Sequence, residues 1–371
     1  MNAQERIAAA IQLEMADRVP VGPWLDHFAA TYAGISKQAF IEDDRQRIAA
    51  VLKTMTELGP WDITYAGENV SRTMLLGAPA RVRWPGHDLP ADEIHQFEEF
   101  ELLTPEDYDL LINSGLSKFM RSMTKRLHPE VGFLSGLTML LRFTLRLKKQ
   151  ARMIERAGAV PAAGFLHPGP LFEFFSIGRS MNLMCMDLYD RPERIREAGK
   201  IWARSLTPIA IRTARFLKVP RIFIGLSRSS PSMISPAHFE ELVLPGLDYM
   251  VRSIIDAGMT PIFHCDTNWL RSLHVFLRYP KAKCILELDG ATDIIKAKEI
   301  LGGHMCLKGD VPAYLLAFAS KDEVLAYCKR LIQEVGRGGG FILSSGCSIP
   351  ANAKPENVRA LAEAAFEWGA A

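Results

Sequence analysis

The sequence predicts an α/β protein whose strands close into a (β/α)8 TIM-type barrel. Eight short apolar runs are bounded by turn residues, and helix-like segments separate most of them. Strands that alternate with helices favour a parallel sheet, and eight such units favour a closed barrel. The competing doubly wound open sheet needs a glycine-rich GxGxxG turn after an early strand, and the sequence has none.

The eight runs extend along the whole chain. They are residues 19–25, 62–67, 160–167, 221–227, 260–266, 283–290, 304–310 and 340–347. Helical segments such as 235–258 and 320–336 lie between them, with Ser-Pro or Ser-x-x-Glu at their starts and Gly at their ends. The first residues mix charged and apolar positions as a surface helix does. We therefore expect one barrel domain over residues 1–371, with an N-terminal helical extension.

Two segments do not fit the simple alternation of strands and helices. Residues 68–103 contain Pro and Gly, and they predict an inserted excursion with short strands. Residues 118–156 hold ten basic side chains against two acidic ones, in a chain whose net charge is +2. Such a charge pattern is typical of a solvated helical hairpin, and it also fits a docking face for an acidic partner or for cofactor phosphate.

The composition limits the class of protein. Of 371 residues 48% are hydrophobic, which is typical of a globular protein with a large core. The net charge of +2 gives no reason to expect nucleic acid as a partner. No apolar stretch has the roughly 18 residues of a membrane span, and the N-terminus is unlike a signal peptide. We expect a cytoplasmic protein without a membrane partner, whose six cysteines are too sparse for a disulfide framework.

Polar side chains follow the predicted strands, where barrels of this type build their chemistry. In strand order they are Asp26 and His27, Glu68 and Asn69, His167, Ser227 and Arg228, His264 with Cys265 and Asp266, Glu287 and Asp289, Asp310, and finally Cys347. This set is rich in metal ligands and acid–base groups. It marks the carboxyl-terminal rim of the barrel as the candidate site.

Three of these residues form a candidate metal site. His264 and Asp266 are two positions apart at a strand end, so their side chains point to the same side while Cys265 points away. Cys347 ends another strand and can meet them across the mouth of the barrel. Imidazole, carboxylate and thiolate are an accepted ligand set for catalytic Zn2+ with one open position. A histidine that merely bonds to its neighbours is the simpler alternative, and Cys265 is expected to be a buried small hydrophobe.

The C-terminal segment FILSSGCSIPANAKPENVRALAEAA resembles that of the uroporphyrinogen decarboxylase superfamily, which carries a G-C-x-[IL]-P…P-x-E-N-[VI] pattern there. The segments MADRVPVGPWL, PIFHCD, ILELDG and KGDVP are similar to family segments as well. The resemblance covers essentially the whole chain and implies the (β/α)8 fold.

The superfamily has two branches with different chemistry. The decarboxylases use no metal and bind carboxylates through two arginines of an N-terminal loop. The corresponding stretch here, VGPWLDHFAATYAG, has no arginine, which disfavours that branch because the guanidinium fork is hard to replace. The other branch consists of zinc-dependent methyltransferases with a His-x-Cys…Cys ligand pattern. His264 and Cys347 match that pattern, whereas Asp266 stands at the middle position, with Cys265 as the alternative ligand.

The resemblance to the second branch implies methyl transfer from a small O- or N-methyl substrate to the cobalt of a separate corrinoid protein. The chain has no D-x-H-x-x-G corrinoid motif of its own, so the corrinoid (cobalamin) is expected on a partner. Glu287, Asp289 and Asp310 are the expected catalytic groups, as a fourth ligand, proton donor or orienting group. The expected substrate-binding residues are Asp26, His27, His167 and Ser227.

Two other functions remain open at this stage. One is a metal-free decarboxylase or lyase in which Asp289 and Asp310 act as general acid and charge stabiliser. The other is a non-catalytic barrel that binds a tetrapyrrole or corrinoid. A homodimer is implied only by analogy with the superfamily.

Overall fold

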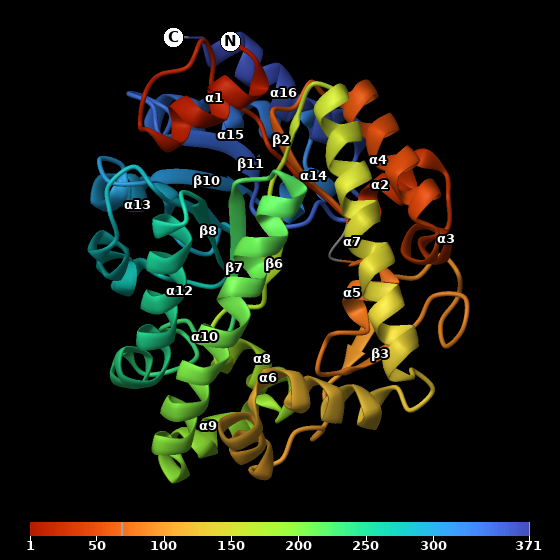
Figure 1. The fold of residues 1–371 in the computed structure, drawn as a ribbon. Coiled ribbons are helices and arrows are strands. Elements are labelled where there is room, and N and C mark those ends of the chain that lie inside the picture. The colour runs from red at the N-terminus through yellow and green to blue at the C-terminus, as the bar shows by residue number, and fades with distance from the viewer. Residues whose placement is uncertain (68–69, 371) are drawn as a thin grey trace.

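The computed structural model describes residues 1–67 and 70–370, and its strands fall where the sequence predicts them (Figure 1). The barrel strands are β1 (Trp24–Leu25), β2 (Ile63–Ala66), β5 (Val160–Pro161), β6 (Phe165–His167), β7 (Arg221–Leu226), β8 (Thr260–Cys265), β9 (Ile285–Leu288), β10 (Cys306–Val311) and β11 (Phe341–Ser345). The strands β5 and β6 are two parts of the single predicted run 160–167. Each of the eight predicted runs therefore contributes to the sheet.

The strands follow one another around a ring of parallel pairs. Hydrogen-bonded ladders connect β1-β2-β5 and, separately, β11-β10-β9-β8-β7-β6. Gly22 N donates to Leu343 O at 2.8 Å, which joins the segment before β1 to β11. Between β5 and β6, Ala162 N donates to Thr64 O and Gly164 N donates to Arg221 O, so the chain passes from one ladder to the other. These contacts complete the predicted (β/α)8 barrel.

Helices surround the ring and cross its ends. They are α1 (Ala3–Ile11), α2 (His27–Ala33), α3 (Lys37–Glu42), α4 (Asp44–Leu58), α5 (Arg72–Leu75), α6 (Glu106–Leu127), α7 (Phe133–Arg156), α8 (Leu171–Gly178), α9 (Met181–Asp190), α10 (Pro192–Leu217), α11 (Pro236–His238), α12 (Leu244–Asp256), α13 (Ile294–Leu301), α14 (Ala313–Phe318), α15 (Lys321–Glu334) and α16 (Pro355–Trp368). The predicted helix 235–258 consists of α11, a π-helical turn and α12, whereas 320–336 forms α15 with a capping box between Ser320 and Glu323. None of the helices in the described part of the chain combines the length and apolar composition needed to cross a bilayer.

The core has two layers because parallel barrel strands are buried on both faces. The inner layer fills the barrel and includes Ile63, Ile262 and Ile342. Ile7 of α1 packs into this inner layer, so the predicted N-terminal helix closes the amino-terminal end of the barrel. The outer layer, which includes Ile224, lies between the strands and the helices. The opposite, carboxyl-terminal end of the barrel is left for the site.

The two predicted excursions have their own structure. Residues 70–103 contain α5 and an antiparallel hairpin of β3 (Arg81–Arg83) and β4 (Gln96–Glu98). Residues 118–156 include the second half of α6, which lies at the bottom of the view, and α7, which runs upward from there beside α5 and toward α4 (Figure 1). The outer surface of α7 carries five leucines that are each at least half exposed, namely Leu134, Leu137, Leu140, Leu141 and Leu145.

Candidate metal centre

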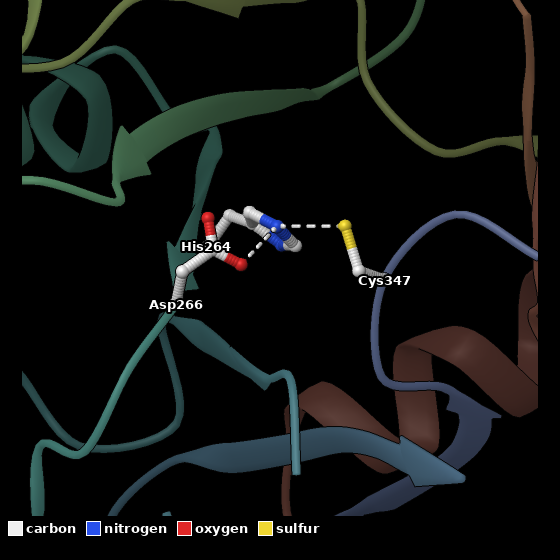
Figure 2. Close-up of side chains that lie close together, drawn as sticks. All are labelled: His264, Asp266 and Cys347. Atoms are coloured by element: carbon white, nitrogen blue, oxygen red, sulfur yellow. Dashed lines mark hydrogen bonds and ion pairs between the residues drawn. The ribbon is translucent and has the colours of Figure 1, made fainter. Parts of the chain in front are cut away.

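Three side chains from opposite parts of the barrel meet at its carboxyl-terminal rim. His264 is the second-last residue of β8, Asp266 follows that strand, and Cys347 follows β11 (Figure 2). One ligand atom of each lies within 4.8 Å of the others. His264 Nε2 is 3.3 Å from Asp266 Oδ1 and 3.6 Å from Cys347 Sγ. The structure thus brings together the three residues that the sequence singles out.

The register of the sheet aims His264 into the barrel. His264 pairs with Gly225 of β7 on one side and with Glu287 of β9 on the other. Because paired residues of adjacent parallel strands point to the same face, His264 and Glu287 are neighbours inside the barrel. His264 is only 3% exposed, whereas Cys347 is exposed. The group is therefore anchored in the barrel interior and open on its outer side.

A buried network holds the other nitrogen of His264. His264 Nδ1 donates to Glu287 Oε2 at 3.0 Å. The second oxygen of that carboxylate, Oε1, accepts from Lys308 Nζ at 2.7 Å and from Tyr65 Oη at 3.0 Å. Glu287 is 2% exposed and Lys308 is 3% exposed, so this ion pair is shielded from water. Both oxygens of Glu287 are engaged.

The charges in this network determine which nitrogen of His264 carries a proton and which one faces Asp266 and Cys347. Burial by itself would raise the pKa of Glu287, but the charges of Lys308 and His264 hold that pKa at about 2. The Glu287 carboxylate is therefore ionised and can only accept, so His264 Nδ1 carries a proton. Burial opposes a charged imidazole, yet bonds to Asp266, Cys347 and Glu287 raise the pKa of His264 well above its usual value. The His264 Nε2 position therefore attracts a proton or another cation.

The donor set fits a zinc ion. A tetrahedral centre with Zn–N and Zn–O bonds of about 2.05 Å and a Zn–S bond of about 2.3 Å places N and O about 3.3 Å apart, and N and S about 3.6 Å apart. The distances from His264 Nε2 to Asp266 Oδ1 and to Cys347 Sγ are 3.3 and 3.6 Å. The carboxylate and a thiolate would also neutralise a divalent ion. His264, Asp266 and Cys347 could therefore hold Zn2+ with little rearrangement.

Aromatic rings surround His264 inside the barrel. The centroid of the His264 ring lies 4.9 Å from that of Trp24 and 5.4 Å from that of Phe223. Tyr65 packs against Trp24 with a centroid distance of 4.2 Å. These rings are largely buried and form an apolar floor beneath the polar group. Such a floor fixes the position of the imidazole ring.

Two of the predicted substrate-binding residues lie next to the three ligand candidates. Burial by itself would raise the pKa of Asp266, but its contact with His264 and, to a smaller extent, its bond to the Ser227 side chain lower that pKa. Asp26 accepts from Trp24 Nε1 at 3.2 Å and from Ser348 Oγ, one residue beyond Cys347. Both residues therefore belong to the rim of the same site.

Other predicted residues have contacts that tie loops together. Asp289 Oδ2 accepts from Thr267 N at 3.0 Å, and its Oδ1 accepts from Ala291 N at 2.8 Å, so this carboxylate connects the loops after β8 and β9. Asp310 Oδ1 accepts from Tyr327 Oη of α15 at 2.9 Å. Burial raises the pKa of Asp310 to about 6. Asp310 is thus directed toward the helix layer.

The two remaining predicted histidines are buried in different surroundings. His27 Nε2 lies 3.1 Å from Nδ1 of His95, so it tethers the first excursion to the start of α2. Burial lowers the pKa of His27 to about 3 and that of His95 to about 4, which keeps both rings neutral. His167 pairs with Ile224 of the outer core layer and accepts from Gly169 N at 3.1 Å. It therefore points to the helices, away from the barrel interior.

Cys265 and the end of the second strand complete the predicted set. Cys265 is fully buried in the outer core layer, and burial raises its pKa well above the usual value. The structure brings Asp266, and not Cys265, to the side of His264 and Cys347. Glu68 and Asn69 lie outside the described residues. Arg228 bonds to Glu99 of the first excursion at 3.4 Å and to Ser176 O at 3.1 Å.

The sequence analysis missed the residues beneath the histidine. Lys308 and Tyr65 lie inside the apolar runs HMCLKGD and DITYAG, and the pattern of polar residues at strand ends does not include them. A lysine within a strand that is buried on both faces needs a partner charge. That rule, applied to residues 304–310, is the signal that could have found the pair between Lys308 and Glu287.

Comparisons with known proteins agree with this architecture. The sequence profile of the family described as uroporphyrinogen decarboxylase (URO-D) matches residues 148–368, more than half of the chain. Among solved structures, the methyltransferase from Methanosarcina mazei superposes with a TM-score of 0.73, covers 99% of both chains and is 18% identical in sequence. At that identity the likeness concerns the fold.

Curated relatives match only in part. A uroporphyrinogen decarboxylase from Methylococcus capsulatus is 30% identical over 86 residues, and one from Thioalkalivibrio sulfidiphilus is 24% identical over 168 residues. These segments cover 23% and 45% of this chain and span 24% and 40% of those relatives, less than two thirds of their length. Together, the profile match and the barrel confirm the family resemblance predicted from the sequence: the chain belongs to the uroporphyrinogen decarboxylase (URO-D) family.

Proposed function

We propose that this protein is a zinc-dependent methyltransferase, which moves a methyl group from a small O- or N-methyl substrate to the cobalt of a separate corrinoid protein. The observation that carries the proposal is the convergence of His264, Asp266 and Cys347 at the barrel mouth, with ligand atoms within 4.8 Å of one another. The fold shared with the Methanosarcina mazei methyltransferase supports the same class of reaction.

His264 Nε2, Asp266 Oδ1 and Cys347 Sγ would hold the zinc ion. When bound, Zn2+ supplies a Lewis acid that polarises the oxygen or nitrogen of the methyl donor. Glu287 fixes the imidazole through Nδ1 so that Nε2 faces the ion. Because Asp266 replaces a softer sulfur ligand, we expect a stronger Lewis acid, suited to an oxygen or nitrogen leaving group.

The residues at the rim would bind and orient the substrate. Cys347 and Asp266 are the more accessible of the three ligand candidates, so the open side of the site faces the mouth. Trp24 and Phe223 limit the depth to which a substrate can enter. Asp26 bonds to Ser348 beside Cys347, and Ser227 bonds to Asp266, so both would contact the heteroatom side of the substrate. The side chain of Asp310 bonds to Tyr327 on the helix side, so its expected catalytic role depends on its position at a strand end and on burial, which raises its pKa to about 6.

The partner corrinoid protein would dock beside α7. This helix combines exposed leucines, such as Leu137 and Leu141, with exposed cations such as Arg142 and Lys149. Contiguous apolar surface of this kind usually marks an interaction site, and the flanking cations favour an acidic partner. The exposed basic residues of α7 thus acquire a specific expected role.

The test is zinc content together with methyl transfer. Zinc per chain is measured for the wild type, His264→Ala and Cys347→Ser, with Cys185→Ser on α9 as the matched cysteine control. We expect about one zinc in the wild type and in Cys185→Ser, and loss in the other two. Methyl donors are then screened with Co(I) cobalamin as acceptor. Zinc retained in Cys347→Ser, or activity that survives removal of zinc, would contradict the proposal.

A metal-free decarboxylase is the second candidate, favoured by the names of the curated relatives. In that case Asp289 and Asp310 would act on a carboxylated substrate. The expected difference is simple: decarboxylation would continue after zinc is removed by a chelator. Release of CO2 from uroporphyrinogen by chelated protein would therefore favour this second function over methyl transfer.

A further inference from the structure

We propose that Lys308 and Tyr65 are positioning residues that hold Glu287 on His264, and thereby keep the fourth coordination position of the metal open. The inference rests on the proposed metal site. It concerns residues beneath that site, which themselves touch neither metal nor substrate.

Glu287 is a further carboxylate in direct contact with one of the three ligand candidates. Its Oε2 accepts from His264 Nδ1 at 3.0 Å, one imidazole ring away from the ligand nitrogen. Its Oε1 is held on the opposite side by Lys308 Nζ at 2.7 Å and by Tyr65 Oη at 3.0 Å. With both oxygens engaged, the carboxylate orients the imidazole and does not join the group of three ligand candidates.

Removal of Lys308 would remove the stronger of the two contacts that hold Oε1 of Glu287. Glu287 is 2% exposed, and its ion-pair partners among the described residues are Lys308 and His264, so without Lys308 its buried charge would face only the metal-bound imidazole. A carboxylate in that state is drawn toward the ion. Four protein ligands would then surround the zinc, as in structural sites, whereas catalytic sites keep one position for water or substrate. Lys308 therefore keeps Glu287 off the metal, so that the site has an open position as catalytic zinc sites do.

The charge count leads to the same expectation. Asp266 and a Cys347 thiolate together balance one Zn2+, and Lys308 balances Glu287 on its own side of the imidazole. A third anion on the ion would weaken its attraction for the heteroatom of a donor. Tyr65 contributes a neutral hydrogen bond, so its removal should have the same direction of effect and a smaller size.

Azide binding to the cobalt-substituted protein tests the proposal, because azide occupies an open position and shifts the visible spectrum of Co2+. The variants are Lys308→Met, Tyr65→Phe, Glu287→Gln and the double variant Lys308→Met/Glu287→Gln. Lys298→Met is the matched control, since Lys298 is a partly buried lysine on α13 that donates to Gly339 O. Zinc affinity is measured in parallel by competition with a chromogenic chelator.

We expect Lys308→Met to lose azide affinity by at least about tenfold while it keeps or tightens zinc binding. Tyr65→Phe should lose a few-fold, and Lys298→Met nothing. The double variant should regain azide binding, because no carboxylate is left to fill the position, and should bind zinc about 10–100-fold more weakly than the wild type, as Glu287→Gln alone does. This rescue separates positioning through Glu287 from simple damage to the fold.

Two results would overturn the inference. One is wild-type azide affinity in Lys308→Met, and the other is a double variant that binds azide no better than Lys308→Met. If the expected pattern appears but no donor yields methyl transfer, the proposed reaction is wrong and the inference stands. A wild type that takes up neither zinc nor cobalt would overturn both.

Discussion

Cys347 Sγ lies 3.6 Å from His264 Nε2, although 83 positions separate the two residues in the chain. Three barrel strands, β9, β10 and β11, lie between these two residues in the sequence. The contact exists because all barrel strands run parallel, so that their carboxyl ends meet at one rim. It defines the place where the chemistry of this protein is expected.

The proposed oxygen ligand Asp266 should influence which metal ions the site binds most tightly. Replacing Asp266 by Cys supplies a second thiolate, so we expect tighter binding of the soft ion Cd2+ relative to Zn2+, and slower methyl transfer from O-methyl donors. Competition titrations with both ions measure the first effect. Asp266→Asn is the control, since it removes the charge without adding sulfur and should weaken both ions. An unchanged ratio of Cd2+ to Zn2+ affinity in Asp266→Cys would exclude Asp266 as a ligand.

The metal-free protein should lose stability as the pH rises, because of His264. Three partners raise the pKa of this buried imidazole well above 6.5. A raised pKa in the folded state contributes stability that is complete below the unfolded value, and that is lost as the pH rises through the folded value. Urea unfolding of the chelated protein should thus show a decline above about pH 6.5 that His264→Gln lacks. Zinc should remove the decline, because the ion replaces the proton.

The buried carboxylate of Asp310 should lower the stability of the folded protein at neutral pH. Burial raises its pKa from 3.8 to about 6, so the ionised form destabilises the folded state, fully above about pH 6 and not at all below about pH 4. Asp310→Asn retains an acceptor for Tyr327 and should gain about 1–3 kcal/mol in unfolding free energy at pH 7. An equal gain from Asp310→Asn at pH 7 and at pH 4 would contradict the raised pKa. If Asp310 carries a proton in the reaction, the stabilised variant should be inactive with zinc retained.

The surface of α7 should govern the affinity for the corrinoid partner. Replacing Arg142 by Glu and Leu141 by Gln removes one cation and one exposed leucine. We expect the KM for a methyl-accepting corrinoid protein to rise about tenfold, with zinc content and the rate with free Co(I) cobalamin unchanged. Lys200→Glu, an exposed lysine of α10 outside residues 118–156, is the charge-matched control. A KM that responds equally to both variants would contradict a specific docking face.

Much of the architecture could be predicted because it depends on local patterns. Apolar runs bounded by turn residues identified the eight strands, and Ser320 with Glu323 marked the start of α15. The i, i+2 spacing of His264 and Asp266 indicated a shared face, and the structure brings both to Cys347. Because the carboxyl ends of parallel barrel strands all lie at one rim, residues that follow the strands in the sequence could be expected to lie near one another in the fold.

Side-chain direction was less accessible to sequence reasoning. His167 ends its run as predicted, yet it points to the outer layer beside Ile224, because the run 160–167 is interrupted between β5 and β6. Asp310 was expected to orient substrate, and it bonds instead to Tyr327 of the helix layer; its role in the reaction stays a prediction. Strands that are buried on both faces lack the alternation of polar and apolar residues that would reveal the phase.

The sequence by itself determined the barrel, the rim on which the polar residues gather and the three ligand candidates, since each depends on the order and spacing of residues along single strands. Only the tertiary structure decided that Glu287 lies behind His264, with Lys308 and Tyr65 on its far side. Those four residues come from four different strands. Their contacts depend on the register between neighbouring strands and on burial, which makes each charge require a partner. Both arise only when several strands pack together, so no single segment of the chain reveals them.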